Sequence, residues 1–429
     1  FTKLILVAHK VLRDLSNDPK SAASLRDVKR TVSLFNWFYN GVGQHLLELI
    51  DSKSKELDAM TLSIFVCYCC RLKESGRKKF WSEIFAKINA NSTALKIKSE
   101  RYFQKLVKKV RMKFVHFLVI DETEFQHIAK NKALSENLFV GFVAIANKIP
   151  LFIIGKPGTS KSLSISILMQ NLSNNSNSPL HKWGAPKIQH FFYQCSPEST
   201  EQAVKTVFDS ARKFNKNIMP VVVLDEVGLA PILKILHEEL EFIDQLHKKG
   251  VMVIGLSNWC LDSAQMNRAI YLERTTPQKK DLIESATEIV NSIARWTEKL
   301  LESDIIKLVK VYLKLEEKQD KNRPYFGLRD VYTMLKSTVI YQKEFARDEC
   351  EEGEYTDSFG RMNIYKIFWK AICHNFNSRS DYRDLIAKTF IAEFGIDYPF
   401  IDTRQLIIQN LTGEKRRHLM VLTKNMAAL

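Results

Sequence analysis

Residues 155–162 read G-K-P-G-T-S-K-S and follow the apolar run L-F-I-I at 151–154. A buried strand that leads through a glycine-bearing turn into a helix points backbone N–H groups and the positive end of the helix dipole at an anion. In such a loop Lys161 reaches the β- and γ-phosphates of a nucleotide, and Ser162 ligates Mg²⁺. Ser160 stands where the usual G-x-x-x-x-G-K-[ST] pattern has glycine, but the flanking strand and helix still favour a phosphate-binding loop. The predicted nucleotide-binding residues are Gly155, Lys156, Pro157, Gly158, Thr159, Ser160, Lys161, Ser162 and Leu163.

A second motif lies at 221–226, where the apolar run V-V-V-L ends in Asp225 and Glu226. Ligand sites in parallel sheets lie at the carboxyl ends of the strands, so these acids are predicted to lie near the loop. Asp225 is expected to hold Mg²⁺ through a bound water, and Glu226 to polarise an attacking water. The structural alternative is that two acids open a helix, whose N-terminus favours negative charge. The loop makes the catalytic interpretation the preferred one.

Two further polar residues flank later strands. Asn258 follows the strand predicted at 251–257, and a neutral amide there can orient the hydrolytic water between Glu226 and the γ-phosphate. The alternative is a simple turn, which asparagine favours. Arg268 precedes the last predicted strand, where ring-forming ATPases place an arginine that completes the site of the neighbouring unit. A surface ion pair is the alternative for Arg268.

A short phrase occurs twice in the chain. S-L-R-D-V at 24–28 and G-L-R-D-V at 327–331 each open an amphipathic helical pattern. The repetition predicts tandem modules, of which one complete copy fits in this sequence. Arg329 heads the second helix and is expected to contact the γ-phosphate and couple hydrolysis to movement of a helical lid. Its alternative role is a capping ion pair with Asp330.

The order of apolar runs predicts an α/β fold with a parallel sheet at its core. Short, fully apolar strands that alternate with helices are typical of a sheet buried on both faces. After Pro277 the strands stop, and residues 279–394 read as helices that form a separate all-α subdomain. The predicted strands are 151–155, 188–195, 221–225, 251–257 and 269–273.

Composition sets the broad class. The chain has 429 residues, more than a single core usually holds, so two or more domains are expected. Its 45% hydrophobic and 26% charged residues are ordinary for a folded protein, and no apolar run approaches the roughly 18 residues of a membrane span. The sequence starts at Phe1 within a helical pattern, so we expect an interior piece of a longer chain.

The formal charge of +16 is concentrated between Arg71 and Lys113, where lysine and arginine recur with few acids. A solvated helix face is the preferred interpretation, and an anionic partner such as nucleic acid is the alternative. The seven cysteines favour neither zinc nor a disulfide framework. The cluster C-Y-C-C at 67–70 is expected to be buried core. Reduced thiols fit a cytosolic or nuclear setting, and a cytoplasmic location is expected.

Taken together, these motifs resemble the AAA+ ATPases, and more narrowly the dynein-like AAA+ core of mysterin-like giant RING-type E3 ubiquitin ligases. The loop of that family has the serine found here at position 160. The resemblance implies a P-loop NTPase core with a C-terminal helical lid, flanked by helical segments of neighbouring units. The matching phrases are I-P-L-F-I-I-G-K-P-G-T-S-K-S-L at 149–163, Q-C-S-P-E-S-T at 194–200, V-V-V-L-D-E-V-G-L-A at 221–230, S-N-W-C-L-D-S-A-Q-M-N-R-A-I at 257–270, L-I-E-S-A at 282–286 and F-G-L-R-D-V-Y at 326–332.

The resemblance also implies a domain order. Residues 1–50 are expected to be the lid of a preceding unit and 51–126 a basic helical insertion or linker. Residues 127–275 are expected to be the nucleotide-binding subdomain and 276–395 its lid. Residues 396–429 are expected to be a linker and the start of a following unit with a degenerate loop. The basic segment matches no part of the family that we recognise.

The expected activity is binding and hydrolysis of ATP with Mg²⁺, with neighbouring AAA+ units of the same chain as partners. An E2 enzyme and ubiquitin are implied only for the whole ligase, since no RING sequence lies in this segment. Two alternatives remain open. One is an ATP-binding regulatory switch with little turnover, and the other is a nucleic-acid-associated motor.

Overall fold

The structure is a computed structural model that divides into two compact units. The first contains residues 1–126 and 130–276, and the second contains residues 127–129 and 277–429. The strand predicted at 419–422 and most of the helix predicted at 232–246 lie outside the described residues. The structure describes residues 2–15, 23–91, 99–118, 128–173, 176–214, 218–230, 236, 238–241, 251–261, 267–293, 300–319, 326–351, 361–376, 382–401, 404–405 and 408.

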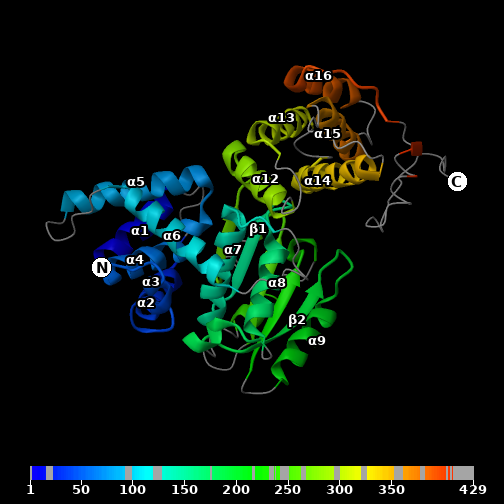
Figure 1. The fold of residues 1–429 in the computed structure, drawn as a ribbon. Coiled ribbons are helices and arrows are strands. Elements are labelled where there is room, and N and C mark those ends of the chain that lie inside the picture. Colours follow the sequence, from blue (N-terminus) through cyan, green and yellow to red (C-terminus); the bar gives the residue numbers. More distant parts are fainter. Residues whose placement is uncertain are drawn as a thin grey trace. The chain divides into compact units, whose positions relative to one another are not determined.

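A five-stranded parallel sheet forms the core of the first unit (Figure 1). Its strand order is β2-β3-β4-β1-β5, and the four pairings between neighbouring strands are all parallel. The predicted parallel α/β sheet is therefore confirmed, with strand ends shifted by one or two residues. The strands are β1 (Leu151–Gly155), β2 (Ile188–Gln194), β3 (Met219–Asp225), β4 (Met252–Ser257) and β5 (Ile270–Arg274).

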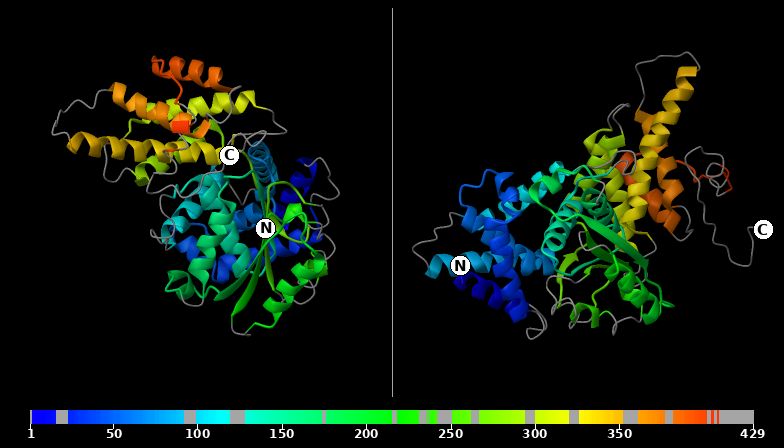
Figure 2. Two further views of the ribbon diagram at one scale, coloured as in Figure 1. Left: turned by 90° about the vertical axis from the view of Figure 1, so that its right-hand side faces the viewer. Right: turned by 90° about the horizontal axis from the view of Figure 1, so that it is seen from below.

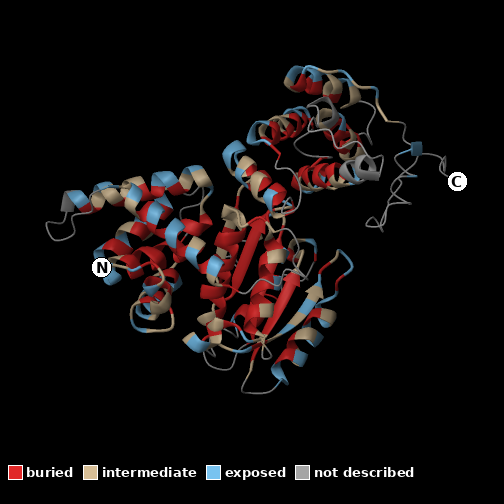
Figure 3. Ribbon diagram, viewed as in Figure 1, coloured by how far each residue is buried: buried red, intermediate tan, exposed pale blue. Residues whose placement is uncertain are grey.

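The central strands are apolar because both of their faces are covered. All residues of β1 and β4 are buried, and Figure 3 shows β1 in red. Right-handed crossovers place α8 and α9 on opposite faces, since the chain moves along the sheet in opposite directions through them. Helices on both faces are visible in Figure 2. The helices and 3₁₀ turns of this part are α7 (Lys132–Ala146), α8 (Lys161–Leu172), η2 (Pro179–Trp183), α9 (Glu201–Arg212) and η3 (Val227–Leu229).

Helices also fill the part of the first unit that precedes the sheet. The helix α4 is buried from Asp58 to Cys67, and the thiols of Cys67, Cys69 and Cys70 are buried as predicted. An aromatic layer joins these helices to α7, including Phe114, which lies 5.0 Å from Phe142 between ring centroids. The elements are α1 (Thr2–Leu15), α2 (Leu25–Asn40), α3 (Gln44–Glu48), α4 (Lys55–Cys67), η1 (Cys69–Arg71), α5 (Glu74–Asn91) and α6 (Arg101–Phe117).

One buried carboxylate binds three arginines from different elements. Glu136 of α7 pairs with Arg77 of α5, Arg111 of α6 and Arg274 of β5, the last two at 3.0 Å. The positive charges of the arginines outweigh burial and hold the pKa of Glu136 far below its ordinary value. Two arginines of the basic stretch thus point inward. The lysines on the outer face of α6, such as Lys105 and Lys108, are exposed as the solvated-face interpretation predicts.

The second unit is helical in its described residues, as predicted for 279–394. Its core gathers apolar side chains such as Leu308, Leu335 and Phe376, all with no exposed surface. No helix in the described part of the chain is long and apolar enough to cross a membrane. The helices are α12 (Lys279–Ile293), α13 (Glu302–Lys318), α14 (Leu328–Glu351), α15 (Arg361–Phe376) and α16 (Arg383–Phe394).

Candidate functional site

The loop between β1 and α8 has the backbone shape that the sequence predicts. Gly158 has φ of 84°, and Ser160 has φ of 58° and ψ of 26°, so both lie in the left-handed region. A serine in this region carries strain that glycine lacks. The loop is held by Thr159, whose Oγ1 donates to the carbonyl of Lys156 at 2.8 Å. Asn137 of α7 adds a bond from Nδ2 to the carbonyl of Thr159 at 3.1 Å.

The ammonium group of Lys161 lies inside the loop. It donates to the carbonyl oxygens of Gly155 at 2.5 Å and Lys156 at 3.2 Å, and to Oδ1 of Asn258 at 2.8 Å. The residue is only 7% exposed. A lysine that buries its charge among oxygen acceptors at a helix N-terminus is placed to bind a phosphate oxygen.

Two oxygen ligands suited to Mg²⁺ meet beside the loop. Ser162 Oγ donates to Asp225 Oδ2 at 3.2 Å, and Asp225 Oδ1 accepts from the backbone N–H of Glu226 at 2.9 Å. Mg²⁺ is usually held by one or two protein oxygens together with waters and substrate phosphates. The hydroxyl of Ser162 and the carboxylate of Asp225 fit this coordination pattern. Among the described residues no group of three or more His, Cys, Asp or Glu side chains could hold a metal by itself.

Asn258 connects the lysine to the second acid. Its Nδ2 donates to Glu226 Oε2 at 2.7 Å, while its Oδ1 accepts from Lys161. Glu226 itself has φ of 53° and ψ of 37°, a left-handed conformation at the end of β3. The structure therefore brings together Lys161, Ser162, Asp225, Glu226 and Asn258, although their chemical roles remain predictions.

The thiol of Cys195 lies near the acidic end of β3 and has a raised pKa. Burial, and after it the negative charges of Asp225 and Glu226, raise the pKa of Cys195 to about 12. Cys195 donates its backbone N–H to the carbonyl of Asp225 at 2.9 Å, which fixes the two strand ends together. The thiol is therefore neutral near pH 7.

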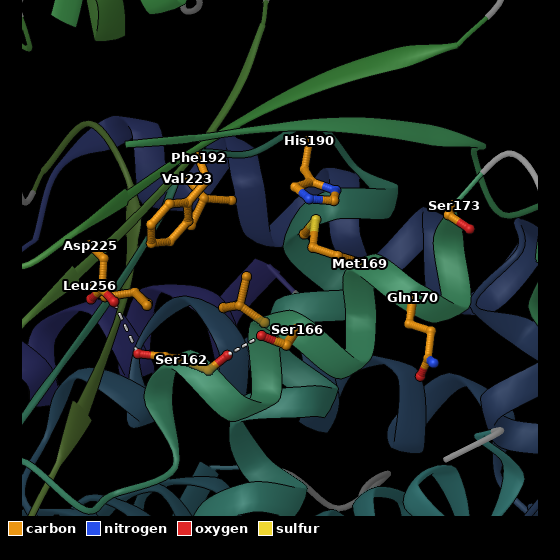
Figure 4. Close-up of a pocket in the computed structure, with 11 residues that line it drawn as sticks. Ser162, Ser166, Met169, Gln170, Ser173, His190, Phe192, Val223, Asp225 and Leu256 are labelled. Carbon is orange, nitrogen blue, oxygen red and sulfur yellow. Dashed lines mark hydrogen bonds between the residues drawn. The ribbon is translucent and has the colours of Figure 1, made fainter. Parts of the chain in front are cut away.

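A cavity of about 410 Å³ opens beside this constellation, between α8 and strands β2, β3 and β4. Figure 4 shows Ser162 and Asp225 at one end of the cavity and Ser173 toward the other. The cavity therefore extends from Ser162 and Asp225, the residues predicted to hold Mg²⁺, along the side of α8 that faces these strands. Its lining residues are Ser162, Ile165, Ser166, Met169, Gln170, Ser173, His190, Phe192, Val223, Asp225 and Leu256.

Arg268 lies at the amino ends of the strands, whereas the loop lies at their carboxyl ends. Ile270 at the start of β5 pairs with Leu151 at the start of β1, whereas the loop follows the end of β1. The guanidinium of Arg268 is 3.7 Å from the carboxylate of Glu241. The ion pair named as the alternative is therefore present, and the role of Arg268 in a neighbouring site remains a prediction.

Arg30 holds the segment that carries Arg268, a contact that the sequence pattern did not reveal. Its Nη1 donates to the carbonyls of Asn267 at 3.2 Å and Ala269 at 3.3 Å, and its Nη2 to that of Arg268 at 2.5 Å. Arg30 is also paired with Asp27, at 3.4 Å. Helix α2 and the segment before β5 are therefore bound to each other within the first unit.

The repeated phrase folds in the same way in both copies. Asp27 Oδ2 accepts from the backbone N–H of Ser24 at 2.8 Å, and Asp330 Oδ2 accepts from that of Gly327 at 2.7 Å. Each aspartate thus closes the first turn of its helix. Arg329 is exposed at the start of α14 in the second unit, and its contact with a nucleotide remains a prediction.

The chain is similar in sequence to a known family of proteins. Residues 127–281 match the family model described as RNF213 AAA domain. The chain is 31% identical over 468 aligned residues to the human E3 ubiquitin-protein ligase RNF213, covering 99% of the chain and 8% of the relative. It is 30% identical over 454 residues to E3 ubiquitin-protein ligase rnf213-beta of Danio rerio, covering 100% of the chain and 8% of the relative. The chain thus spans about 8% of the length of these curated relatives.

A solved structure of Cdc6p from Pyrobaculum aerophilum is also similar. Its TM-score is 0.37 and its sequence identity 11%, over 68% of this chain and 88% of that chain. The parallel sheet with order β2-β3-β4-β1-β5 and its flanking helices is the AAA+ arrangement, as predicted.

Proposed function

Residues 127–281 belong to the RNF213 AAA domain family, and on that premise we propose that this chain binds ATP with Mg²⁺ and hydrolyses it. The observation that carries the proposal is the hydrogen-bonded series from Lys161 through Asn258 to Glu226, at 2.8 Å and 2.7 Å. It joins the residue suited to bind phosphate to the residue suited to polarise water. This link supports a shared role of Lys161 and Glu226 in one site.

Each residue has a distinct role in the proposed reaction. Lys161 and the N–H groups of the loop bind the phosphates and neutralise their charge. Ser162 and Asp225 would hold Mg²⁺, which when bound neutralises charge on the β- and γ-phosphate oxygens. Glu226 accepts the hydrogen bond of the attacking water, and the neutral amide of Asn258 sets the direction of that carboxylate.

The test is Glu226→Gln in the longer protein that contains this segment. The glutamine keeps the shape of the site but cannot act as a base, so turnover should fall by about 10²- to 10⁴-fold while ATP stays bound. The measurements are phosphate release and the ATP:ADP ratio of the purified variant. Unchanged turnover of this unit would contradict hydrolysis, and ATP retained by the unaltered protein would favour the regulatory switch.

The partners follow from the family and remain part of the proposal. Neighbouring AAA+ units of the same long chain are the expected partners, with Arg268 serving the adjoining unit and Arg329 this one. An E2 enzyme and ubiquitin would act on the parent ligase outside this segment. Nucleic acid is not favoured, because Arg71, Arg77 and Arg111 of the basic stretch are bound to buried carboxylates.

A further inference from the structure

The turn that carries Asn258 is fixed by the residues on either side of it. Ser257 Oγ accepts from the backbone N–H of Trp259 at 3.2 Å and donates to the Trp259 carbonyl at 2.6 Å. One hydroxyl therefore spans Asn258 with two hydrogen bonds. Because the side chain of Ser257 is buried at the end of β4, the backbone of Asn258 is anchored to the sheet.

The indole of Trp259 ties this turn to the turn that carries Glu226. Its Nε1 donates to the carbonyl of Gly228 at 3.2 Å. Gly228 belongs to η3, which begins directly after Glu226, and Leu229 donates its N–H back to the Glu226 carbonyl at 2.9 Å. A displacement of Gly228 is thus passed to Glu226 through two peptide units.

The approach of the two turns requires glycine at position 228. A Cβ atom on Gly228 would lie 2.6 Å from Ser257 Oγ and 2.6 Å from Trp259 Nε1. These separations are far shorter than any normal contact, so an alanine would push the turns apart. Ordinary core packing does not explain Trp259, because 47% of it is exposed.

We propose that Trp259 is a positioning residue for ATP hydrolysis, which sets the contact between Asn258 and Glu226 by holding their two turns together. The inference rests on the proposed function. In that reaction the oxygen of water bonds to the γ-phosphorus, and the bond from phosphorus to the β,γ-bridging oxygen breaks. ADP leaves with the bonding electron pair, and the proton of water passes to Glu226 and then to phosphate. Small displacements of a water-orienting group cost large factors in rate, so loss of the indole bond should lower kcat.

The primary experiment is Trp259→Phe in the full-length protein, with turnover of Lys161→Ala subtracted as the contribution of other units. Phenylalanine keeps the ring but lacks the N–H. We expect kcat to fall by about tenfold while KM for ATP changes less than about twofold. Trp183→Phe is the matched control, because Trp183 stacks on Phe117 with ring centroids 4.2 Å apart and does not line the site. An unchanged kcat in Trp259→Phe would overturn the inference.

A second comparison separates positioning from general stabilisation. If Trp259 acts through Asn258, then adding Trp259→Phe to Asn258→Ala should cause no further loss of kcat. Independent, multiplicative losses would overturn the positioning role. If Lys161→Ala itself leaves ATP binding and turnover unchanged, the proposed function fails and the inference fails with it. If Lys161→Ala lowers both ATP binding and turnover while Trp259→Phe leaves kcat unchanged, only the inference fails.

Discussion

Asn258 and Glu226 face each other across the carboxyl edge of the sheet, with Nδ2 of the amide donating to Oε2 of the acid at 2.7 Å. The other end of the amide accepts from Lys161, so the orientation of Asn258 is determined from both sides. A charged residue at 258 could not satisfy both neighbours. An acid would repel Glu226, and a base would repel Lys161.

Lys161→Ala should abolish tight ATP binding. The variant loses the buried ammonium that would bind phosphate, and hydrogen bonds to charged groups of this kind correspond to about 100-fold in affinity. Titration with a fluorescent ATP analogue measures the loss. Lys182→Ala in η2 is the matched control, because that lysine is exposed, and it should bind as the unaltered protein does. Equal affinity in the two variants would count against the loop assignment.

Gly228→Ala should lower turnover more than ATP binding. The added methyl group meets Ser257 Oγ and Trp259 Nε1 at 2.6 Å, so η3 must shift and carry Glu226 with it. We expect a loss in kcat of about tenfold or more, measured by phosphate release at saturating ATP. Gly76→Ala in α5 provides the control, since its Cβ would meet only Leu72 at an ordinary 3.4 Å.

Arg30→Ala should loosen the segment before β5. It removes the donors to three successive carbonyls and leaves Asp27 with one fewer cation, at a cost of about 2–4 kcal/mol in unfolding free energy. Arg30→Lys should recover only part, because an ammonium cannot reproduce the planar fork. Hydrogen exchange of the peptide that contains 267–269 reports the loosening. Lys29→Ala, on the same helix but exposed, should leave exchange unchanged.

Glu136→Gln should destabilise the first unit by about 3–5 kcal/mol, because it leaves three buried guanidinium groups without their carboxylate. Denaturant unfolding measures this difference. Glu83→Gln is the control, since its pair with Lys87 is partly exposed and should contribute less than about 1 kcal/mol.

The same variant gives a prediction about pH. Folding lowers the pKa of Glu136, so its contribution to stability is complete above the ordinary glutamate value of about 4.3. That contribution is lost only as pH falls through the lower folded value. The gap in stability between the unaltered protein and Glu136→Gln should therefore be constant from pH 8 to about pH 5 and narrow only in stronger acid. A gap that closes near neutral pH would show that the cluster is held differently.

Local sequence was sufficient for the loop and for the strands that bear the acids. Apolar runs identify β1 and β3, and Asp225 and Glu226 follow from a strand end. The predicted strand starts at 221, whereas β3 starts at Met219, because Pro220 lacks an N–H and is disfavoured within strands. The structure tolerates it because pairing with β4 begins only at Val221.

The ion pairs could not be predicted in the same way. Arg77 and Arg111 read as part of a basic surface because their partner, Glu136, lies in another helix that is largely apolar. The contacts of Arg30 could not be predicted either, because Arg30 binds backbone carbonyl groups, which every residue has. The sequence signal for Glu136 is a single acid in a largely apolar helix, because a carboxylate buried there requires a cation.

The Glu136 cluster limits where a truncated fragment of the protein can begin and still fold. The match to the family model starts at 127, but Glu136 inside it pairs with two arginines from helices α5 and α6, which end before that point. The aromatic face of α7, including Phe139 and Phe142, is covered by Phe38 of α2 and Phe114 of α6. A fragment that begins at 127 would expose this face and would lack Arg77 and Arg111. The start of the matched family domain and the start of a segment that can fold by itself are therefore different positions in this chain.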